Sequence, residues 1–413
     1  MIKTTNRRLI TCSDHGFLRY PRARHGALVA CAPSLKGGAF SVILTGMAVF
    51  GSAAWAAPAD IRTDYNDADI LVTLPQPALT RAPLPNNAGE LADTIQQQIL
   101  QARRDGDPRY LGYASGLLGQ WPEDHLTDRL RVLRATVSQS LHRFDDARAD
   151  LQTVITTAND TIQKRQAQLT LANLELVQGR YEQAAAQCQA LIESSPGLVA
   201  HSCQAQVQGR TGQPQAAYQQ LLDRTRAEQR YDSSARLWAE GTLADLAAQL
   251  GDARARDHWR FILSQQPDDL YTRARLADWF VDNDQAENAL SLTEGYEHVD
   301  SLAVIQAIAM LQTNHPQANA VITRLRERFS EARWRGSLLH ERDLARFQLD
   351  VEGQPQQALR HALANWQDQR EPEDTRLVLR ASVAAGEQEP AKTVRNWLNQ
   401  HRQTDSRFPE TDS

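Results

Sequence analysis

The sequence predicts an all-α protein built as a solenoid of repeated antiparallel helix pairs. Ala, Gln, Leu, Arg, Asp and Glu dominate the chain, and all of these except Asp favour a helix interior. The sequence contains no long alternating apolar run of the kind that a half-buried strand requires. Short breaks rich in Gly, Pro or Asp separate the helical segments and return at a repeating distance, which indicates a repeat architecture.

Residues 1–56 have the features of a secretory signal peptide. The apolar run at 39–51 follows Lys36 and precedes small residues that end at Ala56, so cleavage after Ala56 is expected. The run is too short for a clear transmembrane helix, although an uncleaved membrane anchor is the alternative. A lipoprotein-like cleavage box ends at Cys31, which makes a lipidated form a further alternative. We therefore expect a mature chain without a transmembrane segment, periplasmic or secreted, in a Gram-negative cell envelope.

The remainder of the chain is acidic. Residues 1–56 hold seven of the 45 Lys and Arg residues and one of the 50 Asp and Glu residues. Subtraction leaves 38 basic and 49 acidic residues, a formal charge of about −11. Because nucleic-acid affinity comes from dense Lys and Arg, the sequence does not predict a nucleic-acid partner.

Three segments flank the regular part of the chain. Residues 57–88 contain five prolines that interrupt any helix, and they are predicted to be a linker. Residues 89–127 are predicted to form a degenerate N-terminal helical pair. The polar segment 404–413 is expected to be a disordered tail. The repeat array is predicted between them, over 128–403.

Pairs of alanines twelve residues apart mark the repeats. Each pair flanks one break in the helical pattern, where small residues let two antiparallel helices approach closely. A second spacing, in steps of four, three and five ending on proline, occurs from Ala184 to Pro196 and again from Ala255 to Pro267. The alanine pairs are Ala135 and Ala147, Ala172 and Ala184, Ala205 and Ala217, and Ala277 and Ala289.

These patterns resemble the tetratricopeptide repeat (TPR), a helix-turn-helix unit of roughly 34 residues. The run from Gly179 to Ala184 is similar to that family's inter-helix turn. The unit at 303–334 lacks the alanine pair, and in the unit at 235–269 Leu243 stands where a small residue is expected, so related helical repeats are the alternative there. For the region as a whole, an ordinary irregular helical bundle is the alternative. The predicted units, about eight in number, are 128–161, 165–198, 198–231, 235–269, 270–303, 303–334, 336–370 and 372–403. The resemblance implies a right-handed superhelix with a concave groove lined by the first helix of each unit.

No sequence pattern for catalysis, metal binding or cofactor binding is found. The chain lacks G-x-S-x-G, H-E-x-x-H and a Gly-rich phosphate loop. The acidic runs at 145–146 and 371–374 fall at helix starts or turns, where carboxylates favour the helix dipole. The sequence therefore predicts no enzyme, no metal and no cofactor, with an unrecognised carboxylate site as the alternative.

Two cysteines follow the signal segment. On the repeat interpretation, Cys188 lies in the second helix of one unit and Cys203 in the first helix of the next. Both are about equally far from the turn at 196–197, so an antiparallel arrangement brings them level. An oxidising periplasm favours a disulfide, and two buried free thiols are the alternative.

The resemblance also implies where a ligand would bind. Carried over from that family, the groove positions are Arg129, Thr136, Gln139, Gln166, Asn173, Gln206, Arg210, Tyr271, Asp278 and Asp282. A solvated surface is the alternative for each. Their mixture of amide, Arg and Asp groups suits a polar peptide or a protein surface. The predicted function is a non-catalytic protein-protein interaction scaffold in the cell envelope. A membrane-tethered accessory protein of an export or surface-polymer machine, and an envelope enzyme, are the alternatives.

Overall fold

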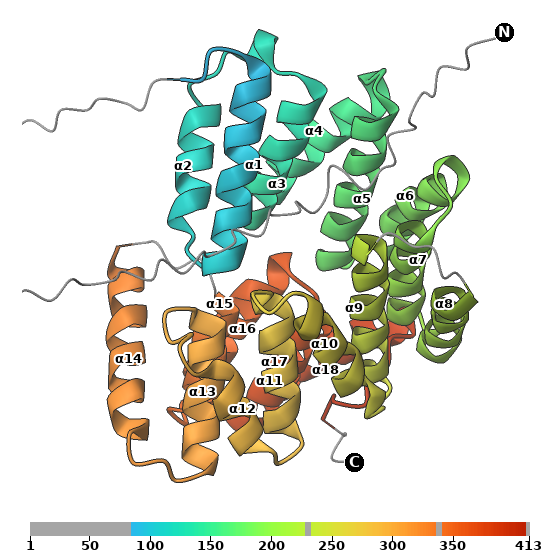
Figure 1. Ribbon diagram of the computed structural model, residues 1–413. Coiled ribbons are helices and arrows are strands. Elements are labelled where there is room, and N and C mark those ends of the chain that lie inside the picture. The colour runs from blue at the N-terminus through green and yellow to red at the C-terminus, as the bar shows by residue number, and fades with distance from the viewer. Residues whose placement is uncertain (1–83, 228–232, 336–340, 410–413) are drawn as a thin grey trace, which may run out of the picture. The chain divides into compact units, whose positions relative to one another are not determined.

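The computed structural model describes residues 84–227, 233–335 and 341–409, and within these it contains helices and no strands. The signal segment and most of the predicted linker lie outside the described residues. Figure 1 shows consecutive antiparallel helices, each packed against its neighbours in the chain. The described residues thus form an all-α array of helix-turn-helix pairs, as the sequence predicts.

In the described residues, eighteen α-helices make up nine pairs. The first pair is α1 and α2, followed by a short 3-10 turn at Glu123–His125, and each of the eight predicted units contains most or all of one further pair. The bounds are α1 Ala88–Asp105, α2 Arg109–Leu118, α3 Asp128–Ser140, α4 Phe144–Thr157, α5 Thr161–Val177, α6 Tyr181–Ser194, α7 Leu198–Arg210, α8 Pro214–Ala227, α9 Ser233–Gln249, α10 Arg254–Gln265, α11 Leu270–Asp282, α12 Ala286–Thr293, α13 Asp300–Gln312, α14 Ala318–Trp334, α15 Glu341–Asp350, α16 Pro355–Asp368, α17 Pro372–Ala385 and α18 Gln388–His401.

The alanine pairs lie where the two helices of a pair approach each other. All eight alanines are buried, with at most 3% of their surface exposed. A larger side chain at these points would separate the helices or force a rearrangement. Leu243, at a position expected to be small, is also fully buried, and Ala255 on the second helix of the same unit is buried in the same hydrophobic cluster. One small residue, Ala255, is thus enough for these two helices to pack closely.

The turn between the two helices of each pair contains one residue in the left-handed conformation. Six of these residues are Gly, and the other three are His142, Asp284 and Asn314. The turn reverses the chain within a few residues, and only Gly adopts the required positive φ without steric cost. This common turn explains why the breaks return at a regular distance in the sequence.

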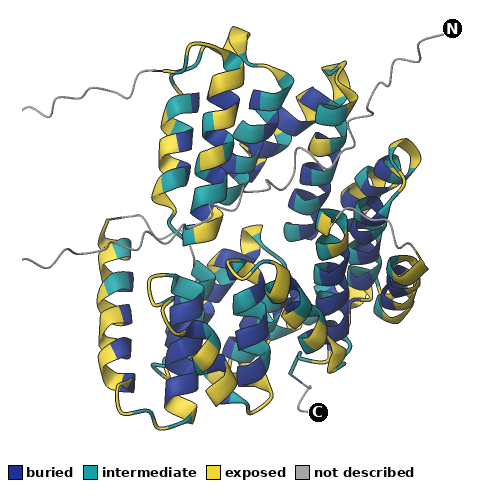
Figure 2. Cartoon of the chain, viewed as in Figure 1, coloured by how far each residue is buried: buried dark blue, intermediate teal, exposed yellow. Residues whose placement is uncertain are grey.

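Burial follows the packing of the pairs. In Figure 2 most helices are buried along one side and exposed along the other, as amphipathic helices in a layered array are. Helix α13 differs, because every residue from Leu302 to Met310 is buried. This helix lies against α11, α12, α14 and α15, so neighbouring helices cover it on several sides.

The C-terminal segment differs from the prediction of a disordered tail. The backbone N–H of Ser406 donates to the carbonyl of Gln249 at 2.9 Å, and the side chain of Gln249 donates to the carbonyl of Thr404 at 2.6 Å. Gln403 and Asp405 are buried. Residues 404–409 therefore pack on the repeat array, because backbone hydrogen bonds and ion pairs compensate for their polar composition.

Candidate binding groove

At the predicted groove positions in α3, the side chains of Arg129 and Thr136 already have hydrogen-bond partners within the molecule. The guanidinium of Arg129 donates to Asp93 and to Gln96, both on α1 and both at 2.7 Å. The hydroxyl of Thr136 donates to the carbonyl of Val132, one turn earlier in the same helix. Gln139 is half-buried. Arg129 therefore joins the first pair to the second and offers little free hydrogen-bonding capacity.

The positions in α5 and α7 are more available. Gln166 is exposed, and Asn173 and Arg210 are half-buried. Gln206 donates to the hydroxyl of Thr242 on α9 at 3.1 Å. Arg210 lies close enough to Asp245 and Glu373 to lower both pKa values, yet no other described residue forms an ion pair or side-chain hydrogen bond with it.

Tyr271 is an exposed residue in the first turn of α11. It exposes 59% of its surface, and its hydroxyl donates to Asp245 on α9 at 3.3 Å. Asp245 also accepts from Arg275 at 3.2 Å. Burial raises the pKa of Asp245 even though Arg275 opposes that change. An exposed aromatic ring thus lies beside a carboxylate and an arginine, and the charge of Arg210 on α7 also acts on that carboxylate.

Farther along the array, the predicted groove carboxylates form ion pairs with arginines of the same chain. Asp278 of α11 forms an ion pair with Arg346 of α15. Asp282 accepts two hydrogen bonds from Arg376 of α17, one of them at 2.9 Å. A ligand could reach these carboxylates only by displacing an arginine. Asp278 and Asp282 are therefore not the free groove positions that the repeat pattern predicts.

Glu373 is a site residue that the repeat pattern did not select. It forms ion pairs with Arg275 of α11 and with Arg407 of the C-terminal segment. Burial alone would raise the pKa of Glu373, but Arg275, Arg407 and Arg210 hold it well below its usual range. The acidic run at 371–374 was visible in the sequence, whereas the arginine partners of Glu373, Arg407 and Arg275, lie 34 and 98 residues away in the chain and carry no local signal.

The rest of the acidic run caps a helix. Glu371 and Asp374 form a reciprocal capping box at the start of α17. Burial raises the pKa of Asp374 to about 7; Arg342 opposes this, and Glu371 and Glu373 add to it. Asp374 also lies 3.0 Å from Arg342. The half-buried Glu373 and the buried Asp374 are thus adjacent carboxyls with separate arginine partners, an arrangement that serves packing and capping.

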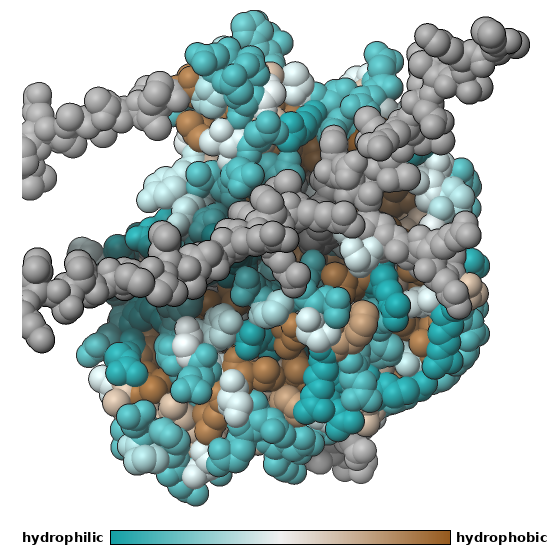
Figure 3. All heavy atoms as spheres, viewed as in Figure 1, coloured by the Kyte–Doolittle hydropathy of each residue, from teal (hydrophilic) through white to brown (hydrophobic). Residues whose placement is uncertain are grey.

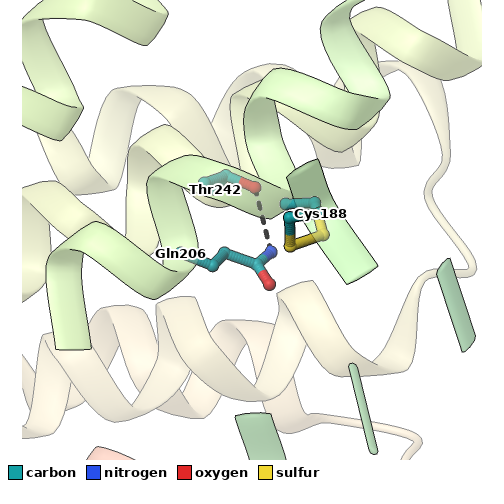
Figure 4. The surroundings of a disulfide bond; sticks show 4 residues. Cys188, Gln206 and Thr242 are labelled. Atoms are coloured by element: carbon teal, nitrogen blue, oxygen red, sulfur yellow. Dashed lines mark hydrogen bonds between the residues drawn. A yellow bond between two sulfur atoms is a disulfide. The ribbon is translucent and has the colours of Figure 1, made fainter. Parts of the chain in front are cut away.

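Cys188 and Cys203 form a disulfide that joins α6 to α7. Their Cα atoms are 5.5 Å apart, and both side chains are buried. Figure 4 shows the disulfide near the hydrogen bond between Gln206 and Thr242. The bond therefore ties two consecutive units together next to the inner surface of α7.

The described residues contain no group of three or more His, Cys, Asp or Glu side chains that could hold a metal ion. No helix among them has both the length and the apolar character needed to cross a membrane. On the face shown in Figure 3, hydrophilic residues predominate among those that are coloured, with hydrophobic residues between them.

Solved structures that match this chain include a TPR domain. The crystal structure of the P58(IPK) TPR domain is 14% identical in sequence, and the match covers 76% of this chain and 95% of that chain with a TM-score of 0.19. At this level of similarity no partner or residue role can be transferred. No family model and no curated protein matches the chain. The described residues nevertheless resemble a TPR-type array in their own geometry, because paired helices with left-handed turns recur along it and the four alanine pairs are buried.

Proposed function

We propose that the chain is a non-catalytic binding scaffold of the cell envelope that holds an extended polar polypeptide. The ligand would lie along α5 and α7 and reach the first turn of α11. One contrast supports this proposal. Gln166, Asn173 and Arg210 keep free hydrogen-bonding capacity on the inner helices, whereas the acids of the later inner helices already bind arginines of the same chain.

The chemistry of the proposed surface fits a polypeptide backbone with at least one acidic side chain. Amide side chains such as Gln166 and Asn173 can donate to and accept from a peptide backbone. Arg210 can form a charge-assisted hydrogen bond with a carboxylate. Tyr271 offers a rigid ring with a polar end, a residue type that is common in protein interfaces.

Photo-crosslinking in cells tests the location of this surface. A photoreactive residue placed at Gln166 or Asn173 is expected to capture the same partner. The control position is Gln183, exposed on the second helix of the same unit, where no capture is expected. Equal capture from all three positions, or capture from Gln183 alone, would contradict binding on the inner surface.

The envelope location belongs to the same proposal and is supported by the signal-like sequence of residues 1–56. Fractionation of cells followed by N-terminal sequencing is expected to find a periplasmic chain that begins at Ala57. A chain that carries a fatty acid on Cys31 would instead support the membrane-tethered alternative. A chain that stays in the cytoplasm with residues 1–56 intact would contradict both.

A further inference from the structure

A second candidate site lies away from the proposed groove, between the loop that precedes α13 and the helix α14. A cavity of about 380 Å³ opens there, a volume within the usual range of small-ligand sites. Its lining has a basic part, an apolar part and one acid. The lining residues are Glu297, His298, Ala303, Val321, Arg324, Leu325 and Arg328.

The two arginines of this cavity are only partly neutralised. The Nε atom of Arg328 lies 2.9 Å from Asp300, and its Nη1 donates to the carbonyl of Glu297 at 2.8 Å. Its Nη2 is buried without a hydrogen-bond partner among the described residues. Arg324, one turn earlier on α14, is exposed, and no other described residue pairs with it. A buried N–H group without a partner is costly, so this site favours an acceptor.

The other lining residues limit the kind of acceptor. The carboxylate of Glu297 accepts from the backbone of Gly295 at 3.1 Å and from Gln306 at 3.3 Å. A hydrogen bond from the backbone N–H of Glu297 itself lowers the pKa of its carboxyl group most, and the bonds from Gly295 and Gln306 lower it further. Glu297 therefore stays ionised beside the cavity. A multiply charged anion would be repelled by Glu297. The side chains of Ala303, Val321 and Leu325 provide an apolar wall that suits a short hydrocarbon group.

We propose that this cavity binds a single carboxylate carried by a short apolar group. The carboxylate contacts Arg324 and Arg328, and the apolar group packs on Val321 and Leu325. Such a group occurs in small branched-chain organic acids and at the end of a polypeptide with an apolar last residue. The site is independent of the proposed groove, so either could exist without the other.

Calorimetric titration of the mature chain tests this assignment. The probes are isovalerate, N-acetyl-alanyl-valine with a free carboxylate, and the neutral amide of each. We expect at least one acid to bind about tenfold or more tightly than its amide, since a charge-assisted hydrogen bond is lost in the amide. Tighter binding of isovalerate indicates a free small acid, and tighter binding of the dipeptide acid indicates a polypeptide end.

The variant Arg324→Gln is expected to weaken binding of the acid by about tenfold. Its matched control is Arg333→Gln, the same change at an exposed position of α14 outside the cavity lining, which should leave binding unchanged. Thermal unfolding of both variants checks that the fold is retained. Equal binding of acid and amide, equal effects of the two variants, or tighter binding of inorganic phosphate than of either acid would overturn the assignment.

Discussion

At the scale of single residues, Gly179 combines two constraints. It turns the chain between α5 and α6 with a φ of +71°. A Cβ atom added there would lie 2.8 Å from Cζ2 of Trp397 on α18 and 3.1 Å from Cδ of Arg370. Gly386 turns the chain between α17 and α18 with the same φ, and a Cβ atom there would meet nothing within 4 Å.

The two glycines allow these constraints to be separated. Gly386→Ala should cost about 1–2 kcal/mol of unfolding free energy, because only the left-handed conformation is penalised. Gly179→Ala should cost about 1–3 kcal/mol more, since Trp397 and Arg370 must also move. Urea unfolding of both variants measures the difference. Equal losses would mean that the contact between the α5–α6 turn and α18 does not constrain the fold.

The lowered pKa of Glu373 predicts how the free energy of unfolding depends on pH. Its folded pKa lies well below the ordinary value of 4.5. The unfolded state therefore binds more protons in acid, and the stabilisation that Glu373 gives above about pH 4.5 is lost as the pH falls through the folded pKa. Glu373→Gln should lose about 3 kcal/mol at neutral pH, because Arg275 and Arg407 lose a buried partner.

The same variant should also show a shallower loss of stability in acid, measured by urea unfolding between pH 3 and pH 7. Glu389→Gln is the control, since the Glu389 side chain is 84% exposed and lies 3.9 Å from Lys392. A pH profile for Glu373→Gln that matches the unchanged protein would show that other carboxylates govern acid unfolding.

At the scale of elements, the disulfide links the second helix of one unit to the first helix of the next. The cysteines are separated by 15 positions, and a loop of that length is expected to contribute about 3 kcal/mol by restricting the unfolded chain. Adding a reductant should lower the unfolding free energy by that amount. The double variant Cys188→Ser and Cys203→Ser should show the lower value with or without reductant. An unfolding midpoint that does not respond to reductant would contradict this contribution.

The helix pairs could be predicted because their signals are local. The twelve-residue step from Ala172 to Ala184 and the glycine at 179 both lie within one unit, where sequence distance and spatial distance agree. The contacts between distant units gave no such signal. Asp278 and Arg346 are 68 residues apart, and nothing near either residue in the sequence specifies the other. The arginines that pair with Asp278 and Asp282 could therefore not be predicted from the sequence, and the other groove positions stay predictions.

At the scale of the whole described array, the later units bind back onto the earlier ones. The backbone N–H of Arg370 donates to the carbonyl of Val177 at 2.7 Å, and the hydroxyl of Tyr181 donates to Gln403 at 2.9 Å. Such contacts join elements that a simple solenoid keeps apart, since its units touch only their neighbours. We therefore expect the units from α5 to the C-terminus to unfold together in one transition.

Removal of the C-terminal segment tests whether these contacts between later and earlier units hold the array together. A chain that ends at Arg402 loses the hydrogen bonds of Gln403 to α6 and of Thr404 and Ser406 to α9, and it loses the ion pair of Arg407 with Glu373. At about 1 kcal/mol for each hydrogen bond, the expected loss is about 3–4 kcal/mol. A chain that ends at Pro409 keeps all of these contacts and is the control.

Hydrogen exchange locates the effect of that truncation. If the segment closes the array, the backbone around Gly251 should exchange faster in the chain that ends at Arg402, because Ser406, which that chain lacks, lies against this turn. Exchange in α1 and α2 should change little, since none of the lost bonds reaches them. Faster exchange spread evenly over all units would instead mean that the segment contributes general stability and does not hold particular repeats together.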